Sequence, residues 1–159
     1  TYALPGAVIG ISIILLFAPV NDSLGFLLIG SIPVLVYAYF IRYMAVAVSP
    51  ILTSFKKYPK KLDDAGKSIG LKPFQFFRKI FIPLNKNAIV IAFCICFVDI
   101  MKELPLTLIL RPFNFDTLAT QTYEYAIEEM ITKSSIYSLT IIIFGIILFS
   151  ILSIKQSKK

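Results

Sequence analysis

Long uncharged runs place the strongest limit on how this chain folds. Residues 134–154 and residues 3–20 contain no charged side chain. A helix rises about 1.5 Å per residue, so about 20 apolar residues cross a hydrocarbon core of about 30 Å. A soluble helical core would need a polar face on each helix, and these runs have none. We therefore expect an all-α membrane protein.

Four segments fit a transmembrane helix. Arg42 is the single charge within the second, and we expect its long side chain to reach the nearer interface. Gly6 and Gly10 form a small-residue face on the first segment, which favours close approach of a neighbouring helix. The expected spans are residues 3–20, 24–48, 82–104 and 134–154.

Lysine and arginine are concentrated in one connection. Residues 49–79 hold eight of the 16 basic residues, whereas residues 105–133 hold two and the turn between the first two spans holds none. Positive charge near membrane helices stays in the cytoplasm. The pattern predicts a cytoplasmic loop at 49–79, an outer segment at 105–133 and a cytoplasmic C-terminus.

The sequence lacks the residues that several kinds of functional site require. It has no histidine, and its two cysteines, Cys94 and Cys96, lie in an apolar run, so a zinc site, a Cys–His nucleophile and a disulfide framework are not expected. No aromatic residues interleave a basic face, which argues against nucleic acid as a partner. A Gly-rich phosphate loop is also missing, so the sequence does not indicate ATP chemistry in this chain.

The basic loop contains a pattern that resembles the cytoplasmic signature of ABC importer permeases. Residues 64–70 read Asp-Ala-Gly-Lys-Ser-Ile-Gly, and after nine residues, positions 80–83 read Ile-Phe-Ile-Pro. The family signature reads Glu-Ala-Ala, three residues, Gly, nine residues, Ile, any residue, Leu, Pro. The spacing matches throughout, and Asp64, Gly66 and Ile82 depart from the family residues. A loop shaped only by its positive charge would explain the lysines but not this spacing.

The resemblance implies a coupling helix that docks into a separate nucleotide-binding subunit. Gly70 fits the end of such a helix and Pro73 the start of another. The implied partners are ATP-binding cassette ATPase subunits, which bind ATP and Mg²⁺, an extracytoplasmic substrate-binding protein, a second permease half or subunit, and membrane lipids. This chain would hold no cofactor and would not itself be an enzyme. The coupling residues implied are Asp64, Ala65, Gly66, Gly70, Ile80 and Pro83.

Residues 102–120 resemble ferric-iron importer permeases, and related permeases for thiamine and polyamines share parts of this stretch. The resemblance implies ferric iron as the substrate, with thiamine or a polyamine as the alternative. A membrane scaffold with a lipid-binding basic loop is the alternative from another class. Permease halves of this family have five or six spans, so residues 1–159 are expected to be an incomplete permease domain, the C-terminal part of a longer chain.

Three charges stand near the end of the third span. Asp99 and Lys102 can pair on one helix face, and Glu103 would share that face, so we expect Lys102 between two carboxylates. Such groups are costly in a membrane unless they pair or face water. Two interpretations remain open, a charge-neutralising cluster and a lining of the transport path. Tyrosines and carboxylates at 123–129 fit an interfacial belt, and no metal site is predicted.

Overall fold

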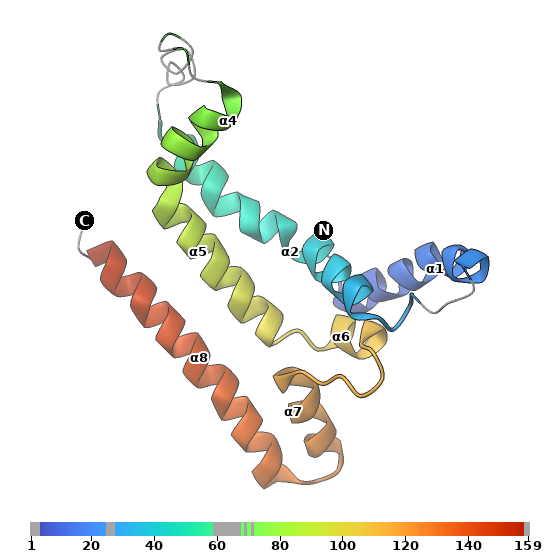
Figure 1. Cartoon of the computed structure of the whole chain (residues 1–159). Coiled ribbons are helices and arrows are strands. Elements are labelled where there is room, and N and C mark those ends of the chain that lie inside the picture. Colours follow the sequence, from blue (N-terminus) through green and yellow to red (C-terminus); the bar gives the residue numbers. More distant parts are fainter. Residues whose placement is uncertain (1–3, 25–27, 59–67, 69, 71, 158–159) are drawn as a thin grey trace.

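The computed structural model describes residues 4–24, 28–58, 68, 70 and 72–157. Every regular element within these residues is helical, so the all-α fold is confirmed (Figure 1). The elements are α1 (Gly6–Leu24), α2 (Ile32–Phe55), α4 (Pro73–Phe76), the π-helix η1 (Phe77–Phe81), α5 (Ile82–Met101), α6 (Pro105–Leu110), α7 (Leu118–Ile127) and α8 (Ile131–Ser157).

Three of the described helices are long and apolar enough to cross a membrane. They cover Ile32–Phe55, Pro73–Met101 and Ile131–Ser153, and the second of these joins α4, η1 and α5 into one rod. The helix over Gly6–Asn21 is apolar but shorter. The membrane-protein fold is therefore confirmed, whereas the count of four spans stays a prediction.

The helices flanking the basic loop differ from their expected bounds. α2 begins at Ile32, where Pro33 fits the first turn because its missing N–H has no helical partner there. It then continues past residue 48 to Phe55, with Pro50 inside. The next helix already starts at Pro73 rather than at residue 82. Both helices therefore extend into the segment expected as a loop.

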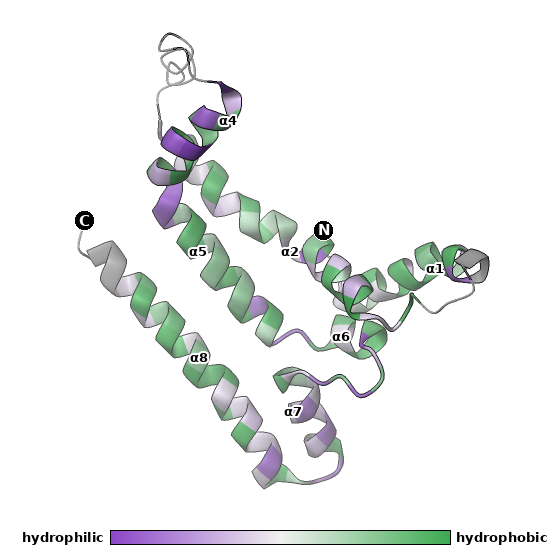
Figure 2. Cartoon of the chain, in the orientation of Figure 1, coloured by the Kyte–Doolittle hydropathy of each residue, from purple (hydrophilic) through white to green (hydrophobic). Residues whose placement is uncertain are grey.

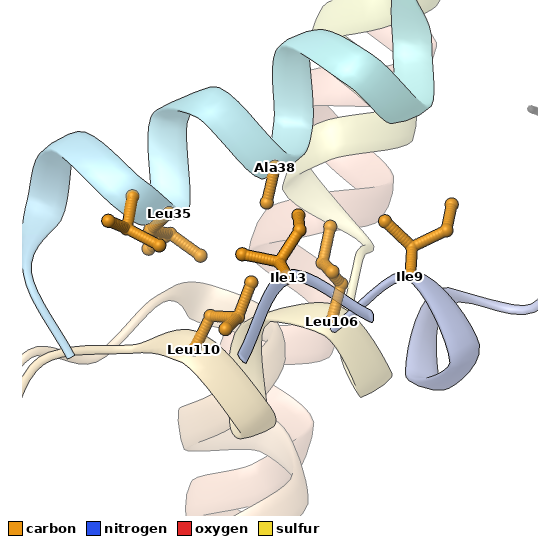
Figure 3. Packing of buried hydrophobic residues seen from close by; sticks show 7 residues of the cluster. Ile9, Ile13, Leu35, Ala38, Leu106 and Leu110 are labelled. Carbon is orange, nitrogen blue, oxygen red and sulfur yellow. The ribbon is translucent and has the colours of Figure 1, made fainter. Parts of the chain in front are cut away.

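A hydrophobic core forms where α1, α2 and α6 meet (Figure 3). Side chains from these three helices point toward one another, and Leu106 and Leu110 of the short helix α6 have no exposed surface. Phe17 of α1 meets Tyr37 of α2 edge to face, with ring centroids 5.8 Å apart. The core residues drawn and labelled are Ile9, Ile13, Leu35, Ala38, Leu106 and Leu110.

Helix α8 packs against α7 at one end and runs antiparallel to α5 along the rest of its length (Figure 1). The Tyr125 and Tyr137 rings stack with centroids 5.6 Å apart, and Ser134 Oγ donates to Thr122 O at 2.8 Å. Most apolar side chains farther along α8 are exposed, and Figure 2 shows this helix as mostly apolar beyond the hydrophilic end next to α7. A helix that is apolar all round belongs in a membrane or against further helices.

Candidate functional site

Contacts between the end of α2 and the start of α5 form a closed stem, from which the basic loop extends. The Tyr58 hydroxyl, just after α2, donates to Leu84 O in the first turn of α5 at 2.9 Å. The Phe81 ring lies 5.6 Å from Phe55 and 5.2 Å from Phe77, centroid to centroid. These contacts connect the end of α2 to the start of α5. The stem therefore joins the two helices beside the loop.

A π-turn adjusts the helix where the stem meets α5. Pro83 has no N–H, and within a regular α-helix its ring would clash with the carbonyl four residues earlier. In η1 the Ile82 N–H donates instead to Phe77 O, five residues back. Asn85 Nδ2 donates to Phe81 O at 3.0 Å. The helix thus continues through Pro83 from the stem into α5.

The described part of the predicted coupling segment is open to solvent or a partner. Gly70 has φ of +72°, the left-handed conformation that ends helices, and a Cβ built there meets no atom within 4 Å. Pro73 opens α4 as predicted, and Phe74 is 73% exposed. Ile80 is half-buried and Pro83 exposed. The predicted coupling residues Asp64, Ala65 and Gly66 lie outside the described residues.

At the other end of α5, Glu103 forms the centre of a buried polar cluster. Its Oε2 accepts hydrogen bonds from Arg42 Nε at 3.1 Å and from the Tyr43 hydroxyl at 2.6 Å. Its Oε1 accepts from the Leu106 backbone N–H at 3.2 Å. The side chain of Glu103 is only 6% exposed. One carboxylate therefore links α2 to the segment that joins α5 and α6.

Two glycines of α1 allow this cluster and α6 to approach closely. A Cβ at Gly6 would lie 2.5 Å from Glu103 Oε1, and one at Gly10 would lie 3.1 Å from Ile109 Cγ2. Arg42 Nη1 also donates to Leu4 O at 3.0 Å, just before α1. The small-residue face predicted on the first apolar segment therefore exists, and its neighbours are α6 and the Arg42–Glu103 pair.

Two acidic residues around α7, Asp116 and Glu124, pair with one arginine. Arg111 pairs with Asp116, and its Nη2 lies 2.5 Å from Glu124 Oε1. Lys133 Nζ lies 5.4 Å from the centroid of the Tyr125 ring. Over the described ranges, no group of three or more His, Cys, Asp or Glu side chains could hold a metal ion.

The sequence matches a known protein family over nearly its whole length. Residues 1–157 match the family described as the binding-protein-dependent transport system inner membrane component. The chain belongs to this family. It is accordingly a membrane component of a transport system.

Two curated relatives illustrate the family. The chain is 29% identical over 144 residues to the Fe(3+)-transport system permease protein FbpB 2 of Haemophilus influenzae, an alignment that covers 91% of this chain and 28% of that protein. It is 30% identical over 91 residues to the maltose/maltodextrin transport system permease protein MalG of Photorhabdus laumondii, covering 57% of this chain and 30% of that protein. The chain thus spans less than a third of each relative's length.

The charged residues predicted near the end of the third span divide into two groups in this permease chain. Lys102 Nζ lies 2.8 Å from Asp99 Oδ1, so the predicted pair forms. The expectation that Glu103 shares their helix face is wrong, because α5 ends at Met101 and Glu103 turns toward α2. Arg42 correspondingly pairs with Glu103 and does not extend alone to an interface.

Sequence reasoning missed two links, Arg42–Glu103 between α2 and the segment after α5, and Tyr58–Leu84 between the end of α2 and the start of α5. A signal existed for the first, because a lone arginine in an apolar run requires a partner, and Glu103 is one of few carboxylates in comparable surroundings. No comparable signal existed for the second link, since a tyrosine beside a run of lysines has many alternative hydrogen-bond partners. Cys94 is buried and Cys96 half-buried, and both are free thiols.

Proposed function

We propose that this chain forms part of the permease of an ATP-driven importer. In this proposal an extracytoplasmic binding protein delivers the substrate, and a second permease half or subunit completes the path. ABC ATPase subunits, which bind ATP and Mg²⁺, drive inward transport by alternating access. Membership of a binding-protein-dependent transport family supports the permease role. We assign ATP hydrolysis to a partner because this sequence contains no phosphate loop.

The charge distribution supports an orientation with the basic loop and the C-terminus in the cytoplasm. Lys57, Lys72 and Lys79 belong to the end of the molecule near the stem, whereas Glu124 and Glu128 belong to the segment near α7. Positive charge resists translocation far more than negative charge does. The family description, an inner membrane component, agrees with a multi-pass protein of that membrane.

The closed stem is the observation that carries the coupling proposal. The Tyr58–Leu84 hydrogen bond and the Phe55–Phe81 contact connect the loop to two membrane helices at once. A force applied to the loop by an ATPase would therefore move α2 and α5 together. We assign the docking surface to the residues of the signature, namely Asp64, Ala65, Gly66, Gly70, Ile80 and Pro83.

A matched pair of glycine substitutions tests this coupling. Gly70 and Gly30 have positive φ values of 72° and 79°, and neither has an atom within 4 Å of a built Cβ. Gly70→Ala and Gly30→Ala therefore impose a similar backbone strain without an internal clash. In the full-length permease, we expect Gly70→Ala to lower substrate-stimulated ATP hydrolysis and uptake severalfold. Gly30→Ala should change both by less than twofold.

Equal effects of the two substitutions would mean that strain, not docking, causes the loss, and would count against the coupling proposal. Co-purification gives an independent measurement. An ATPase subunit should be retained by the full-length permease and be partly lost with Gly70→Ala. If no ATPase is retained by the unaltered permease, the scaffold alternative with a lipid-binding loop is favoured.

Ferric iron is the substrate we propose. The ferric-transport relative aligns over 91% of this chain, whereas the maltodextrin relative aligns over 57%. Uptake of radiolabelled ferric iron by cells that produce the full transport system is the direct test. We expect no competition from thiamine, polyamines or maltodextrin. Uptake of any of these compounds without iron uptake would replace the substrate and leave the import mechanism intact.

For the transport path, we propose Asp99 and Lys102 as lining residues. The Lys102 side chain is 61% exposed and forms an ion pair with Asp99, so the pair places polar groups at the surface of otherwise apolar helices. Glu103 is less suited to this role, because its carboxylate is buried against α2. Lys102→Gln should lower uptake with little change in thermal stability, whereas unchanged uptake would remove the pair from the path.

A further inference from the structure

A cavity of about 540 Å³ lies where the end of α2, the start of α5 and the last turns of α8 come together. Its volume is many times the roughly 30 Å³ that one water molecule occupies. Ser49, Ser54 and Lys57 line it from the end of α2, Asn87 from α5, and Leu152 from α8. The cavity is therefore polar on the side of the basic loop and apolar toward α8.

Several donors in this cavity have no hydrogen-bond partner within the part of the chain that the structure describes. Among the described residues, no hydrogen bond or ion pair engages the side chains of Ser54, Lys57 or Asn87. No described carboxylate belongs to the lining. An ammonium, a hydroxyl and an amide that face the same space provide donors for an anionic group.

A second cavity continues from the first along α5 and α8. It has a volume of about 190 Å³ and is bordered by Cys94 and Val98 of α5 and by Gly145 and Leu148 of α8. Leu152 lines both cavities, so they adjoin. The single carboxylate of the lining, Asp99, lies at the far end and is paired with Lys102. Figure 2 shows apolar colouring on both helices along this length.

The two cavities together define the α5–α8 seam, meaning the space from Lys57 and Asn87 to Val98 and Gly145. From Asn87 to Val98, α5 rises about 17 Å at 1.5 Å per residue. Half of a hydrocarbon core of about 30 Å is about 15 Å. The seam therefore has the length of one leaflet, with a cationic, hydrogen-bonding site at one end and apolar walls along the rest.

We propose that the α5–α8 seam binds one anionic phospholipid from the leaflet on the side of the basic loop. Lys57, Ser54 and Asn87 bind its phosphate headgroup, and an acyl chain lies between α5 and α8 beside Gly145. Basic pockets between membrane helices are sites of this kind. The proposal is independent of the transported substrate and of ATPase docking.

The first test uses the full-length permease in nanodiscs of either phosphatidylglycerol or phosphatidylcholine. Native mass spectrometry after detergent exchange then counts retained lipid. We expect phosphatidylglycerol to be retained preferentially, and Lys57→Gln to weaken its binding about fivefold. Lys56→Gln is the matched control, because Lys56 is exposed and does not line the cavity. Equal retention of both lipids, or equal effects of the two lysine substitutions, would overturn the proposal.

The second test separates a lipid from a free anion or a protein segment. A Cβ at Gly145 meets no atom within 4 Å and Gly145 borders the second cavity, so Gly145→Leu places its side chain in the seam. It should lower phosphatidylglycerol retention severalfold while leaving the phosphate end unchanged. If inorganic phosphate displaces the lipid and Gly145→Leu has no effect, the site binds a free anion. If a cysteine introduced by Gly145→Cys crosslinks to another protein segment in native membranes, that segment fills the seam; either result overturns lipid binding.

Discussion

The α1–α2–α6 junction and the α5–α8 seam are built in opposite ways. The junction buries Leu106 and Leu110 completely and closes around the Arg42–Glu103 pair. The seam contains two cavities, and no part of the apolar window of α8 is buried. Both regions consist of apolar helices of similar composition, so hydrophobicity alone does not decide which helices pack together.

Small residues and buried polar partners make the difference. Gly6 and Gly10 bring α1 within contact of Glu103 and Ile109, and the Glu103 carboxylate satisfies donors from α2 and α6. In a membrane, apolar side chains gain little from leaving lipid, so close backbone approach and hydrogen bonds decide helix association. The seam has one glycine, Gly145, and nothing lies against it.

The largest effect should come from removing the carboxylate at the junction. Glu103→Ala leaves Arg42 Nε without its acceptor and removes the 2.6 Å hydrogen bond of the Tyr43 hydroxyl, although Leu4 O and Asp99 O still accept from these two side chains. Breaking a buried pair in this way costs about 3–5 kcal/mol of unfolding free energy. Denaturant-induced unfolding of the full-length permease in detergent measures it.

An apolar replacement of both partners is the control for that measurement. The double variant Arg42→Met with Glu103→Leu removes the charge together with its partner, so a large part of the lost stability should return. If the double variant is as unstable as Glu103→Ala, the junction depends on the shape of the two side chains and not on their charge balance.

The same substitution in the two regions compares their packing directly. Leu106→Ala removes a fully buried side chain from the junction and should cost about 2–5 kcal/mol. Leu139→Ala, on an α8 side chain that is 55% exposed, should cost less than about 0.5 kcal/mol. Similar losses in the full-length permease would show that α8 is packed as tightly as the junction.

A smaller effect is expected from a methyl group at the closest approach in the junction. A Cβ at Gly6 would lie 2.5 Å from Glu103 Oε1, so Gly6→Ala must displace the carboxylate or α1. Overpacking of this kind costs about 1–3 kcal/mol. The shift in thermal unfolding measures the loss, and it should shrink in a Glu103→Ala background, where the obstructing group is gone. Unchanged loss in that background would locate the strain elsewhere.

Much of the fold was predictable because membrane helices can be recognised in a sequence as long uncharged runs. The helical class, the start of a helix at Pro73 and the Asp99–Lys102 pair were all derived from local patterns, and the structure bears them out. The helical class depends on continuous runs along the chain, and the Asp99–Lys102 pair on residues within one helical turn of each other. Such short-range geometry is fixed by the helix itself.

The helix ends were harder to predict from charge. Lysines from Lys56 onward suggested a loop that starts at residue 49, yet residues 49–55 carry no charge and can continue the helix. α2 accordingly reaches Phe55. At the end of α5, Lys102 departs from the helical conformation, with φ of −95° and ψ of 0°, and α6 begins at Pro105. Glu103 lies between the two helices, so its carboxylate can turn toward Arg42.

Arg42 and Glu103 could not be paired from the sequence alone, since they are far apart along the chain and several carboxylates were available. Their pairing depends on which helices are neighbours, and in a membrane that choice is made by small residues and polar contacts in three dimensions. The glycines of α1 indicated a close approach but not its partner, which proved to be the short helix α6.

The smallest predicted effect is a gain at the glycine of the seam. Gly145 lies inside α8, and a built Cβ there meets no atom within 4 Å. Replacing a helix glycine by alanine stabilises an open position by up to about 1 kcal/mol, because alanine loses less backbone freedom on folding. Gly145→Ala should therefore raise the unfolding temperature of the full-length permease slightly, whereas Gly6→Ala lowers it. A loss of stability at Gly145 would mean that a neighbour in the complete transporter packs against this glycine. The seam would then be packed as closely as the junction in the complete transporter.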